Sequence, residues 1–206
     1  MDNTEGSQAI SQTFRARKNL ELCLSNKQMT ILLGSILGDA YIHPQGKICI
    51  EHARSQKEYL FWKYSKLKSA AYPKVAKVVR NDSRTNNQTI SWRFFLRQYF
   101  RPLRKAFYKN QKKVIPRAIY PWISPLLIAV WYMDDGYLDK KTYPLLMTEC
   151  FSKSDTNFLV KSLKKKFQLN CFTNNKGRIR IRKQSADRFF NLIEPHIHQK
   201  MRYKLP

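Results

Sequence analysis

Two short apolar segments of this chain each end in an aspartate beside a small residue. The first segment, residues 31–40, ends around Asp39, and the second, residues 128–136, ends around Asp135. Both segments have the composition of a buried helix, and the helix dipole disfavours negative charge near a helix C-terminus. The two acids are therefore better explained by chemistry than by helix stability. Two such ends brought together hold two carboxylates side by side, an arrangement that binds a divalent metal for phosphate chemistry.

The charge balance points to a polyanionic partner. Thirty-nine lysines and arginines against 14 acidic residues give a formal net charge of +25. A surface this basic repels itself unless a polyanion neutralises it, and nucleic acid is the first candidate, with an anionic membrane second. No segment approaches the roughly 18 apolar residues of a membrane span, and the basic residues are spread along the chain. We therefore expect a nucleic-acid partner and no membrane.

The chain contains the same structural unit twice. Ser25 and Gln28 form the pattern of a capping box before the first apolar segment, and Ser124 with Pro125 forms a helix start before the second. Each half then follows the order α-β-β-α-β-β-α. The two motif segments lie roughly 100 residues apart, which is too long for a solenoid repeat and favours two half-domains related by a pseudo-two-fold axis. We predict an α+β fold with half-domains at 25–120 and 121–206, preceded by residues 1–24 as an arm or a disordered lead.

Hydrophobic periodicity gives the expected elements of each half. In the first half we expect a strand, a helix, a hairpin and a final helix at residues 47–51, 56–71, 75–96 and 99–108. In the second half we expect a strand, a helix capped by Ser154, a hairpin and a final helix at residues 145–151, 154–167, 169–182 and 185–194.

The strands carry a second signal, because arginine and isoleucine alternate along residues 178–182. Strand faces alternate with period two, so three arginines share one face and two isoleucines the other. An ordinary solvated sheet face is the alternative, but a saddle of basic strands fits the DNA major groove. The residues expected to contact DNA by this argument are Tyr41, His43, Lys47, Arg80, Asn81, Arg84, Gln88, Arg93, Tyr137, Lys141, Asn174, Arg178, Arg180 and Arg182.

The two motifs, together with the segments 107–116, 131–136, 148–152 and 201–206, resemble the single-chain branch of the LAGLIDADG homing endonucleases. The resemblance covers residues 25–206. It implies two αββαββα halves whose motif helices pack against each other at the centre of a β-saddle. Gly34 and Gly38 supply the small residues that close helix packing needs, whereas Val130 and Asp134 stand at the matching positions of the second helix. We therefore expect a wider or asymmetric helix crossing.

The resemblance also implies a metal site. Asp39 and Asp135 would bind the metal together with the backbone of Ala40 and Gly136, and Asp134 is the competing ligand. The implied cofactor is Mg²⁺ or Mn²⁺, with two or three ions shared at the helix interface. These ions would stabilise the attacking water and the leaving 3′ oxygen in an in-line displacement. Each aspartate would serve mainly one strand, so that a duplex is cut with short 3′ overhangs.

Similar enzymes place further polar residues around the metals. A residue on the second strand of each half holds the nucleophilic water, and the matching residues are Glu149 in the second half and His52 or Glu51 in the first. A lysine after the last helix of each half lies near the scissile phosphate. Lys204 fits this place in the second half, and Lys113, with Lys112 as the runner-up, fits it in the first.

The leading function is thus a magnesium-dependent, site-specific endonuclease that acts on double-stranded DNA. The alternative is a maturase, a splicing cofactor of the same fold whose partner is intron RNA. A third class, a basic binding protein such as a ribosomal component, explains the charge but not the two acids. Relatives of this type are usually encoded in organelle introns, and the chain shows no transit or signal peptide. We expect synthesis inside a chloroplast or mitochondrion, no secretion, and a monomer without an obligate protein partner.

Overall fold

The computed structural model describes residues 9–16, 20–82 and 87–206. The first half contains the expected order of elements, namely α1 (Asn26–Leu37), β3 (Tyr41–Ile42), β4 (Ile48–Ala53), α2 (Lys57–Lys66), β5 (Ala71–Asp82), β6 (Asn87–Leu96) and α3 (Arg101–Phe107). The second half repeats this order with α4 (Pro125–Asp135), β9 (Gly136–Asp139), β10 (Tyr143–Leu146), α5 (Lys153–Phe167), β11 (Cys171–Thr173), β12 (Ile179–Ile181) and α6 (Ala186–Ile193). The α+β fold with two αββαββα halves is therefore confirmed.

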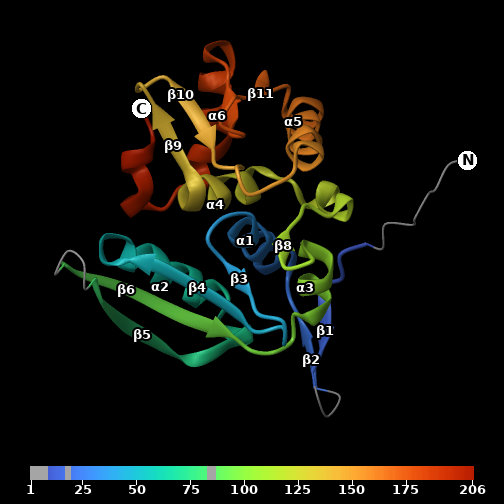
Figure 1. Cartoon of the computed structure of the whole chain (residues 1–206), viewed down its shortest axis with the longest axis vertical. Coiled ribbons are helices and arrows are strands. Elements are labelled where there is room, and N and C mark those ends of the chain that lie inside the picture. The colour runs from blue at the N-terminus through green and yellow to red at the C-terminus, as the bar shows by residue number, and fades with distance from the viewer. Residues whose placement is uncertain (1–8, 17–19, 83–86) are drawn as a thin grey trace, which may run out of the picture.

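The motif helices α1 and α4 lie side by side at the centre, with one half of the chain on either side (Figure 1). Both begin as the sequence predicts. Ser25 accepts a hydrogen bond from the Gln28 amide and Gln28 returns one to the Ser25 amide, while Ser124 accepts from the Leu127 amide. Residues 29–37 of α1 and 127–134 of α4 are all buried. Such all-round apolar helices are stable only inside a core.

Glycines on α1 set the distance between the two central helices. A Cβ added to Gly34 would stand 2.9 Å from Cβ of Val130, and one added to Gly38 would stand 2.4 Å from Cβ of Asp134. The contact is thus asymmetric, as expected: α1 supplies the small residues, and the larger side chains of α4 fill the space that they leave. Any larger residue at either glycine must push the helices apart.

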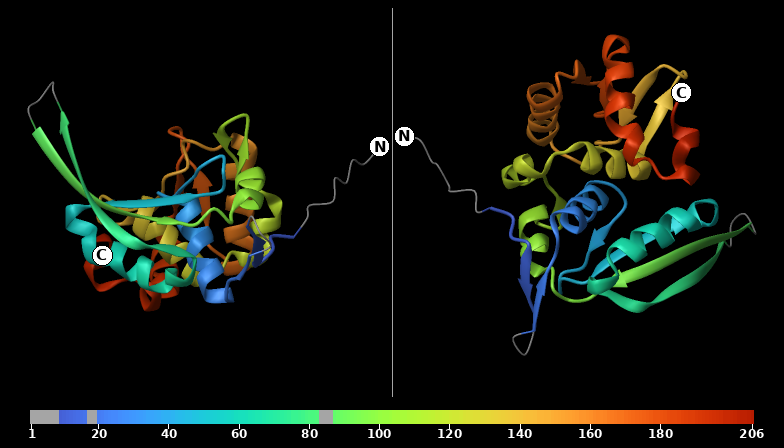
Figure 2. Two further views of the ribbon diagram at one scale, coloured as in Figure 1. Left: turned by 90° about the horizontal axis from the view of Figure 1, so that it is seen from below. Right: turned by 180° about the vertical axis from the view of Figure 1, so that it is seen from behind.

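Each half contributes a four-stranded antiparallel sheet. The strand orders are β3-β4-β6-β5 and β11-β12-β10-β9. Alternate residues of β4 (Ile48, Ile50 and His52) are buried, and Ile179 and Ile181 of β12 are buried likewise. The other face of each sheet is left open. Figure 2 shows that the two sheets differ in reach, since the curved β5–β6 hairpin extends past the body of the protein. Its strands have 12 and 10 residues, against three each in β11 and β12.

The N-terminal stretch packs onto the first half wherever it is described. Strands β1 (Thr13–Arg15) and β2 (Glu21–Cys23) form an antiparallel hairpin. Phe14 is 1% exposed and meets Phe100 edge to face, with ring centroids 4.9 Å apart. The described part of the expected N-terminal arm is therefore a hairpin that is attached to the first half through the buried Phe14 side chain.

The structure corrects two local predictions in the second half. Strand β10 ends at Leu146, so residues 147–151, which were expected to continue the strand, form a turn in which the Phe151 amide donates to the Thr148 carbonyl. Helix α5 is capped by Ser152, whose hydroxyl accepts from the Asp155 amide, and not by Ser154. Both differences arise in the turn between β10 and α5. Ser152 and Ser154 can each cap a helix, and the length of this turn decides which of them does. No helix in the described ranges is long and apolar enough to cross a membrane.

The close helix contact predicts the effect of Gly38→Ala. The added methyl group collides with Asp134 across the interface, and overpacking of this kind typically costs about 1–3 kcal/mol. Thermal or urea unfolding should show that loss. Ser35→Ala on the same buried helix is the control, because the Ser35 hydroxyl has no partner among the described residues and its removal should be nearly neutral. Equal stabilities for the two variants would contradict this packing.

Candidate functional site

The two motif acids meet at the ends of the central helices. Asp135 is the last residue of α4 and Asp39 follows the end of α1. Burial and the negative charges of Asp39 and Asp134 raise the pKa of Asp135 to about 7, as expected when carboxyl groups lie close together. The Asp39 side chain is 37% exposed. The pair therefore sits where solvent, or a bound polyanion, reaches it.

This pair suits a hard divalent cation. Magnesium and calcium bind through carboxylate oxygens, and a cation between Asp39 and Asp135 would remove the repulsion that raises the pKa of Asp135. The chain turns from helix to strand beside each acid. The Ala40 amide donates to the Ser35 carbonyl, 2.8 Å away, and the Gly136 amide donates to the Tyr132 carbonyl. These turns bring the backbones of Ala40 and Gly136 next to the acid pair.

Asp134, the neighbouring acid, is held in a different place. Its side chain is fully buried. Lys63 of α2 donates to both of its carboxylate oxygens at 2.6 Å, and the Tyr59 hydroxyl donates to Oδ1 at 2.8 Å. Lys63 is itself fully buried. This ion pair joins α4 of the second half to α2 of the first, beneath the acid pair.

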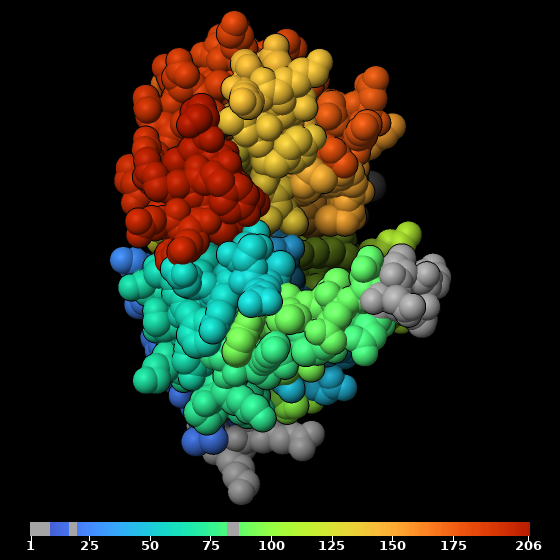
Figure 3. Space-filling model, turned by 90° about the vertical axis from the view of Figure 1, so that its left-hand side faces the viewer, coloured from blue at the N-terminus to red at the C-terminus, as the bar shows by residue number. Residues whose placement is uncertain are grey.

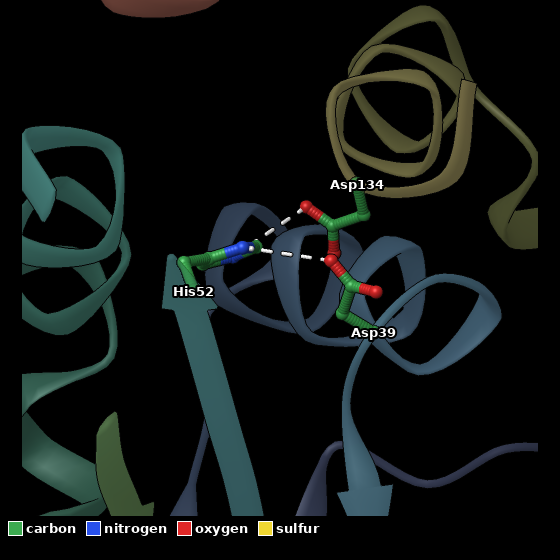
Figure 4. Close-up of side chains that lie close together, drawn as sticks. All are labelled: Asp39, His52 and Asp134. Atoms are coloured by element: carbon green, nitrogen blue, oxygen red, sulfur yellow. Dashed lines mark ion pairs between the residues drawn. The ribbon is translucent and has the colours of Figure 1, made fainter. Parts of the chain in front are cut away.

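His52, near the end of strand β4, points toward both Asp134 and Asp39 (Figure 4). Its Nε2 atom is 3.1 Å from Lys63 Nζ, and its Nδ1 atom is 3.5 Å from Asp39 Oδ2. Burial and the positive charge of Lys63 lower the pKa of His52 to about 3. The ring is therefore neutral, and its approaches to the two acids are dipolar contacts rather than ion pairs.

Ligand atoms of Asp39, His52 and Asp134 all lie within 4.8 Å of one another, which is close enough for the three residues to hold one metal ion. Lys63, however, already occupies both oxygens of Asp134 and faces His52 Nε2. A cation there would have to displace a buried ammonium group. The geometry therefore favours the Asp39–Asp135 pair, and not Asp134, as the place for a metal.

The two expected lysines each lie at the C-terminal end of a motif helix. Lys113 donates to the Gly38 carbonyl at 2.9 Å, and Lys204 donates to the Met133 and Asp134 carbonyls at 2.6 and 3.1 Å. Burial lowers the pKa of both ammonium groups. A cation at this end of a helix interacts favourably with the dipole. Each lysine thus bonds to the end of the motif helix of its own half, while Lys112 of β8 (Lys112–Lys113) is exposed.

The C-terminal residues that carry Lys204 are packed onto the first half. In Figure 3 the red C-terminal segment rests on the cyan region that contains α2 and β4. The Gln56 amide donates to the Tyr203 hydroxyl at 3.1 Å, and Lys200 pairs with Glu58 at 3.1 Å. The Tyr132 hydroxyl donates to the Lys204 carbonyl at 2.8 Å. These contacts fix the position of the ammonium group from both halves.

Sheet register places Glu149 away from the position expected for it. Tyr41 pairs with Cys49 in the first half, and Tyr137 pairs with Leu145 in the second. Strand β10 ends at Leu146, so Glu149 does not lie on the second strand of its half. Glu149 is exposed in the turn after β10 and forms an ion pair with Arg178. Glu51 likewise pairs with Arg80 on the open face of the first sheet. Glu51, the alternative to His52 in the first half, therefore belongs to the open sheet surface.

The open face of the first sheet is basic and aromatic. Arg93 lies opposite Glu51 across β4 and β6, and Lys47 stacks over Phe95 with its Nζ 3.8 Å from the ring centroid. Tyr41 is 45% exposed. Further expected DNA contacts lie on β5 and β6 or their flanks, where the Gln88 amide donates to Asn81 Oδ1 at 3.2 Å. His43 is partly buried at the β3–β4 turn. Arg84 lies outside the described residues.

The open face of the second sheet carries the predicted arginines. Arg180 alternates with the buried Ile179 and Ile181, which confirms the two-faced strand. Arg180 lies 3.4 Å from Asp139 and over the Tyr143 ring, and Arg182 lies over the Phe172 ring. Asn174 is used instead in a turn, where its Oδ1 accepts from the Lys176 and Arg178 amides. Lys141 is exposed in the β9–β10 turn.

Comparison with known proteins adds the family. The model of the LAGLIDADG DNA endonuclease family matches residues 29–189. The chain belongs to this family. It is similar to the probable intron-encoded endonuclease 1 of Wickerhamomyces canadensis, at 32% identity over 95% of this chain and 90% of the relative. It is also similar to the DNA endonuclease I-ChuI of Chlamydomonas applanata, at 25% identity over 89% of this chain and 96% of the relative.

Two further similarities bear on this LAGLIDADG protein. The solved structure of the homing endonuclease I-WcaI bound to its DNA recognition sequence matches with a TM-score of 0.79 and 28% identity, over 89% of this chain and 87% of that one. The cytochrome b mRNA maturase bI2 of Debaryomyces hansenii is 26% identical over 91% of this chain and 76% of the maturase. The structural likeness extends over both halves and confirms the fold expected for the family.

The sequence pattern did not single out Lys63 and Tyr59, although both contact Asp134 beside the motif acids. A signal was present, because Tyr59, Lys63 and Leu67 are four residues apart and Tyr59 and Leu67 are both apolar in character. Residues at this spacing share one helix face. A lysine in that row is either at the edge of the buried face or buried with a partner. Only the structure shows that its partner is Asp134, which is 71 residues away in the chain.

The buried ion pair predicts the behaviour of Lys63→Met. Removing the ammonium group leaves the Asp134 carboxylate buried without its cation, and breaking such a pair from one side typically costs about 3–5 kcal/mol. Urea unfolding should show this loss.

The double variant Lys63→Met/Asp134→Asn is the control, because it removes both charges and keeps the size of residue 134 at the tight Gly38 contact. It should recover most of the stability. A double variant as unstable as Lys63→Met would show that the pair is not what holds these side chains.

Proposed function

We propose that this chain is a homing endonuclease that binds a long DNA site across its two open sheet faces and cuts both strands with the help of divalent cations. The observation that carries the proposal is the meeting of Asp39 and Asp135 at the ends of the two packed motif helices, between the two sheets. The similarity to a homing endonuclease bound to its DNA recognition sequence supports it. So does the net charge of +25, which suits a polyanionic duplex.

In this proposal the acids and lysines divide the chemistry between them. Asp39 and Asp135, with the backbone at Ala40 and Gly136, would hold two or three Mg²⁺ or Mn²⁺ ions, which would supply Lewis-acid chemistry for phosphodiester hydrolysis. Lys113 and Lys204 stand beside the acids and place positive charge where the phosphate gains negative charge. His52 stands beside Asp39 in the first half, and Glu149 orients Arg178 in the second.

A splicing role is the second candidate, and the similarity to the cytochrome b mRNA maturase bI2 favours it. Intron RNA would then replace or join DNA as the partner. A splicing cofactor needs the basic faces, but it does not need two adjacent carboxyl groups, one of which has its pKa raised by burial and by its acidic neighbours. The acid pair therefore favours the nuclease. Splicing of the intron RNA that still occurs with a variant lacking both acids would establish the second role.

The remaining features of the proposal concern the setting of the protein. The half-domains divide near residue 120, between α3 and α4, with residues 1–24 as an N-terminal addition to the first half. Because one chain contains both motif helices, a monomer holds a complete site. The relatives named as intron-encoded endonucleases support synthesis inside a mitochondrion or chloroplast.

The first functional prediction concerns the two acids. Asp39→Asn or Asp135→Asn should abolish double-strand cleavage, because each removes a carboxylate that holds metal, while DNA affinity changes by less than about threefold since phosphate contacts come from the sheets. Asp187→Asn is the control, because Asp187 is an exposed acid on the first turn of α6. The substrate is a library of randomised duplex sites, assayed with Mg²⁺ and with EDTA. Wild-type cleavage rates in either active-site variant would refute the metal assignment.

The second functional prediction concerns the sheets. Log affinity for the DNA site should fall linearly with log salt concentration, because phosphate contacts release counterions. Arg180→Gln on the open face of β12 should lower that slope by about one if the side chain contacts phosphate. Arg188→Gln on α6, whose side chain bonds to Gln168, should leave the slope unchanged. Affinities measured with Ca²⁺ over a salt series test this, and equal slopes for both variants would remove Arg180 from the DNA interface.

A further inference from the structure

A chain of polar contacts links the second motif helix to the acid of the first. Lys63 Nζ has three N–H groups, and the structure uses all of them: two for the oxygens of Asp134 at 2.6 Å and one for His52 Nε2 at 3.1 Å. Lys63 and Asp134 are fully buried, and the side chain of His52 is 1% exposed. Water therefore does not compete for these contacts, and the three groups constrain one another's orientation.

This arrangement determines the tautomer of His52. Because Lys63 donates to Nε2, that nitrogen must carry a lone pair, and the single ring proton is on Nδ1. Nδ1 faces two acceptors, Gln56 Oε1 at 3.1 Å and Asp39 Oδ2 at 3.5 Å. The N–H group thus donates to Gln56 and lies beside the carboxylate of Asp39. Active-site contacts of this length commonly shorten once the substrate is bound.

The second half does not repeat the parts of this arrangement that can be matched by sequence position. Thr148 follows Leu145 by three residues, as His52 follows Cys49, but it lies in the turn after β10. Its hydroxyl is occupied by the backbone, donating to the Gly177 carbonyl at 2.6 Å and accepting from the Ile179 amide at 3.1 Å. The residue before the acid of α1 is Gly38, which has no side chain to match Asp134. Asp135 therefore receives no contact equivalent to that of His52 with Asp39.

We infer that Lys63 and His52, anchored by Asp134, are positioning residues for Asp39 alone, so that the two DNA strands are cut by unequally supported acids. The inference rests on the proposed function. This relay from Lys63 through His52 places a ring N–H 3.5 Å from one oxygen of Asp39. Asp135 instead has the ammonium group of Lys113 as its neighbouring charge. Loss of the relay should therefore slow one strand more than the other.

The test measures both strands at once. A duplex carrying the target site is labelled with a different fluorophore on each strand, and single-turnover rate constants for the two cuts give a ratio. His52→Leu removes the N–H and should change that ratio at least about tenfold, the size expected for a small misplacement of a reacting group, so that a nicked intermediate with one particular strand intact accumulates. Lys63→Met/Asp134→Asn should shift the ratio in the same direction.

Two variants separate positioning from general damage. His52→Gln has an amide N–H that can replace Nδ1–H, and it should return the ratio most of the way to the wild-type value. Thr148→Val removes a buried polar group at the equivalent place of the second half, and it should leave the ratio within about twofold of wild type even if it lowers stability. Equal slowing of both strands by His52→Leu, or no change in the ratio, would overturn the inference.

A second measurement does not depend on cleavage. Two-dimensional ¹⁵N NMR of the metal-free protein, with the His52 signal assigned by its absence from His52→Gln, reports which ring nitrogen carries the proton. We expect the Nδ1–H tautomer in the wild-type protein and a loss of that preference in Lys63→Met/Asp134→Asn. An Nε2–H tautomer in the wild type would overturn the relay. If the wild-type protein cuts no DNA, the proposed function fails, and this spectrum still decides whether the relay exists.

Discussion

The close contact between α1 and α4 is the interaction on which the rest of the structure depends. Gly34 and Gly38 remove the side chains that would keep the helices apart, and Val130 and Asp134 of the partner helix occupy the space. Because the helices run side by side to their C-terminal ends, their terminal acids arrive at one place. A looser crossing would separate Asp39 from Asp135 and leave two isolated carboxylates without a joint site. The packing of two apolar core helices thus brings together the two carboxyl groups of the candidate site.

The close helix contact brings several negative charges together, and neighbouring lysine side chains offset them. Three carboxylates stand within or beside the ends of two helices, where the dipoles already add negative potential. Lys63 neutralises Asp134 inside the core, while Lys113 and Lys204 bond to the last carbonyls of the helices. The charge that remains is concentrated on Asp39 and Asp135, at the exposed edge. The protein in this way keeps two anions close together and available to a metal.

The two halves share a topology but differ in detail. The β5–β6 hairpin is several times longer than β11–β12, and His52 and Asp134 are matched in the other half by Thr148 and Gly38. A single chain permits such divergence, because each half needs to fit only the other and not a copy of itself. The asymmetry lies both in the surface that would read DNA and in the support of the two acids. An asymmetric duplex is therefore a natural partner.

The sequence by itself determined the repeated αββαββα order, the caps at Ser25 and Ser124, the alternation at residues 178–182 and the pairing of two acids, because each is encoded locally by periodicity or by a motif. The end of β10 and the choice of Ser152 over Ser154 needed the fold, since a turn of either length suits the local residues. The burial of Lys63 against Asp134, and with it the tautomer of His52, was decided by tertiary structure alone. These groups come from separate elements of different halves, and only the packing of α1 against α4 brings them within hydrogen-bonding distance.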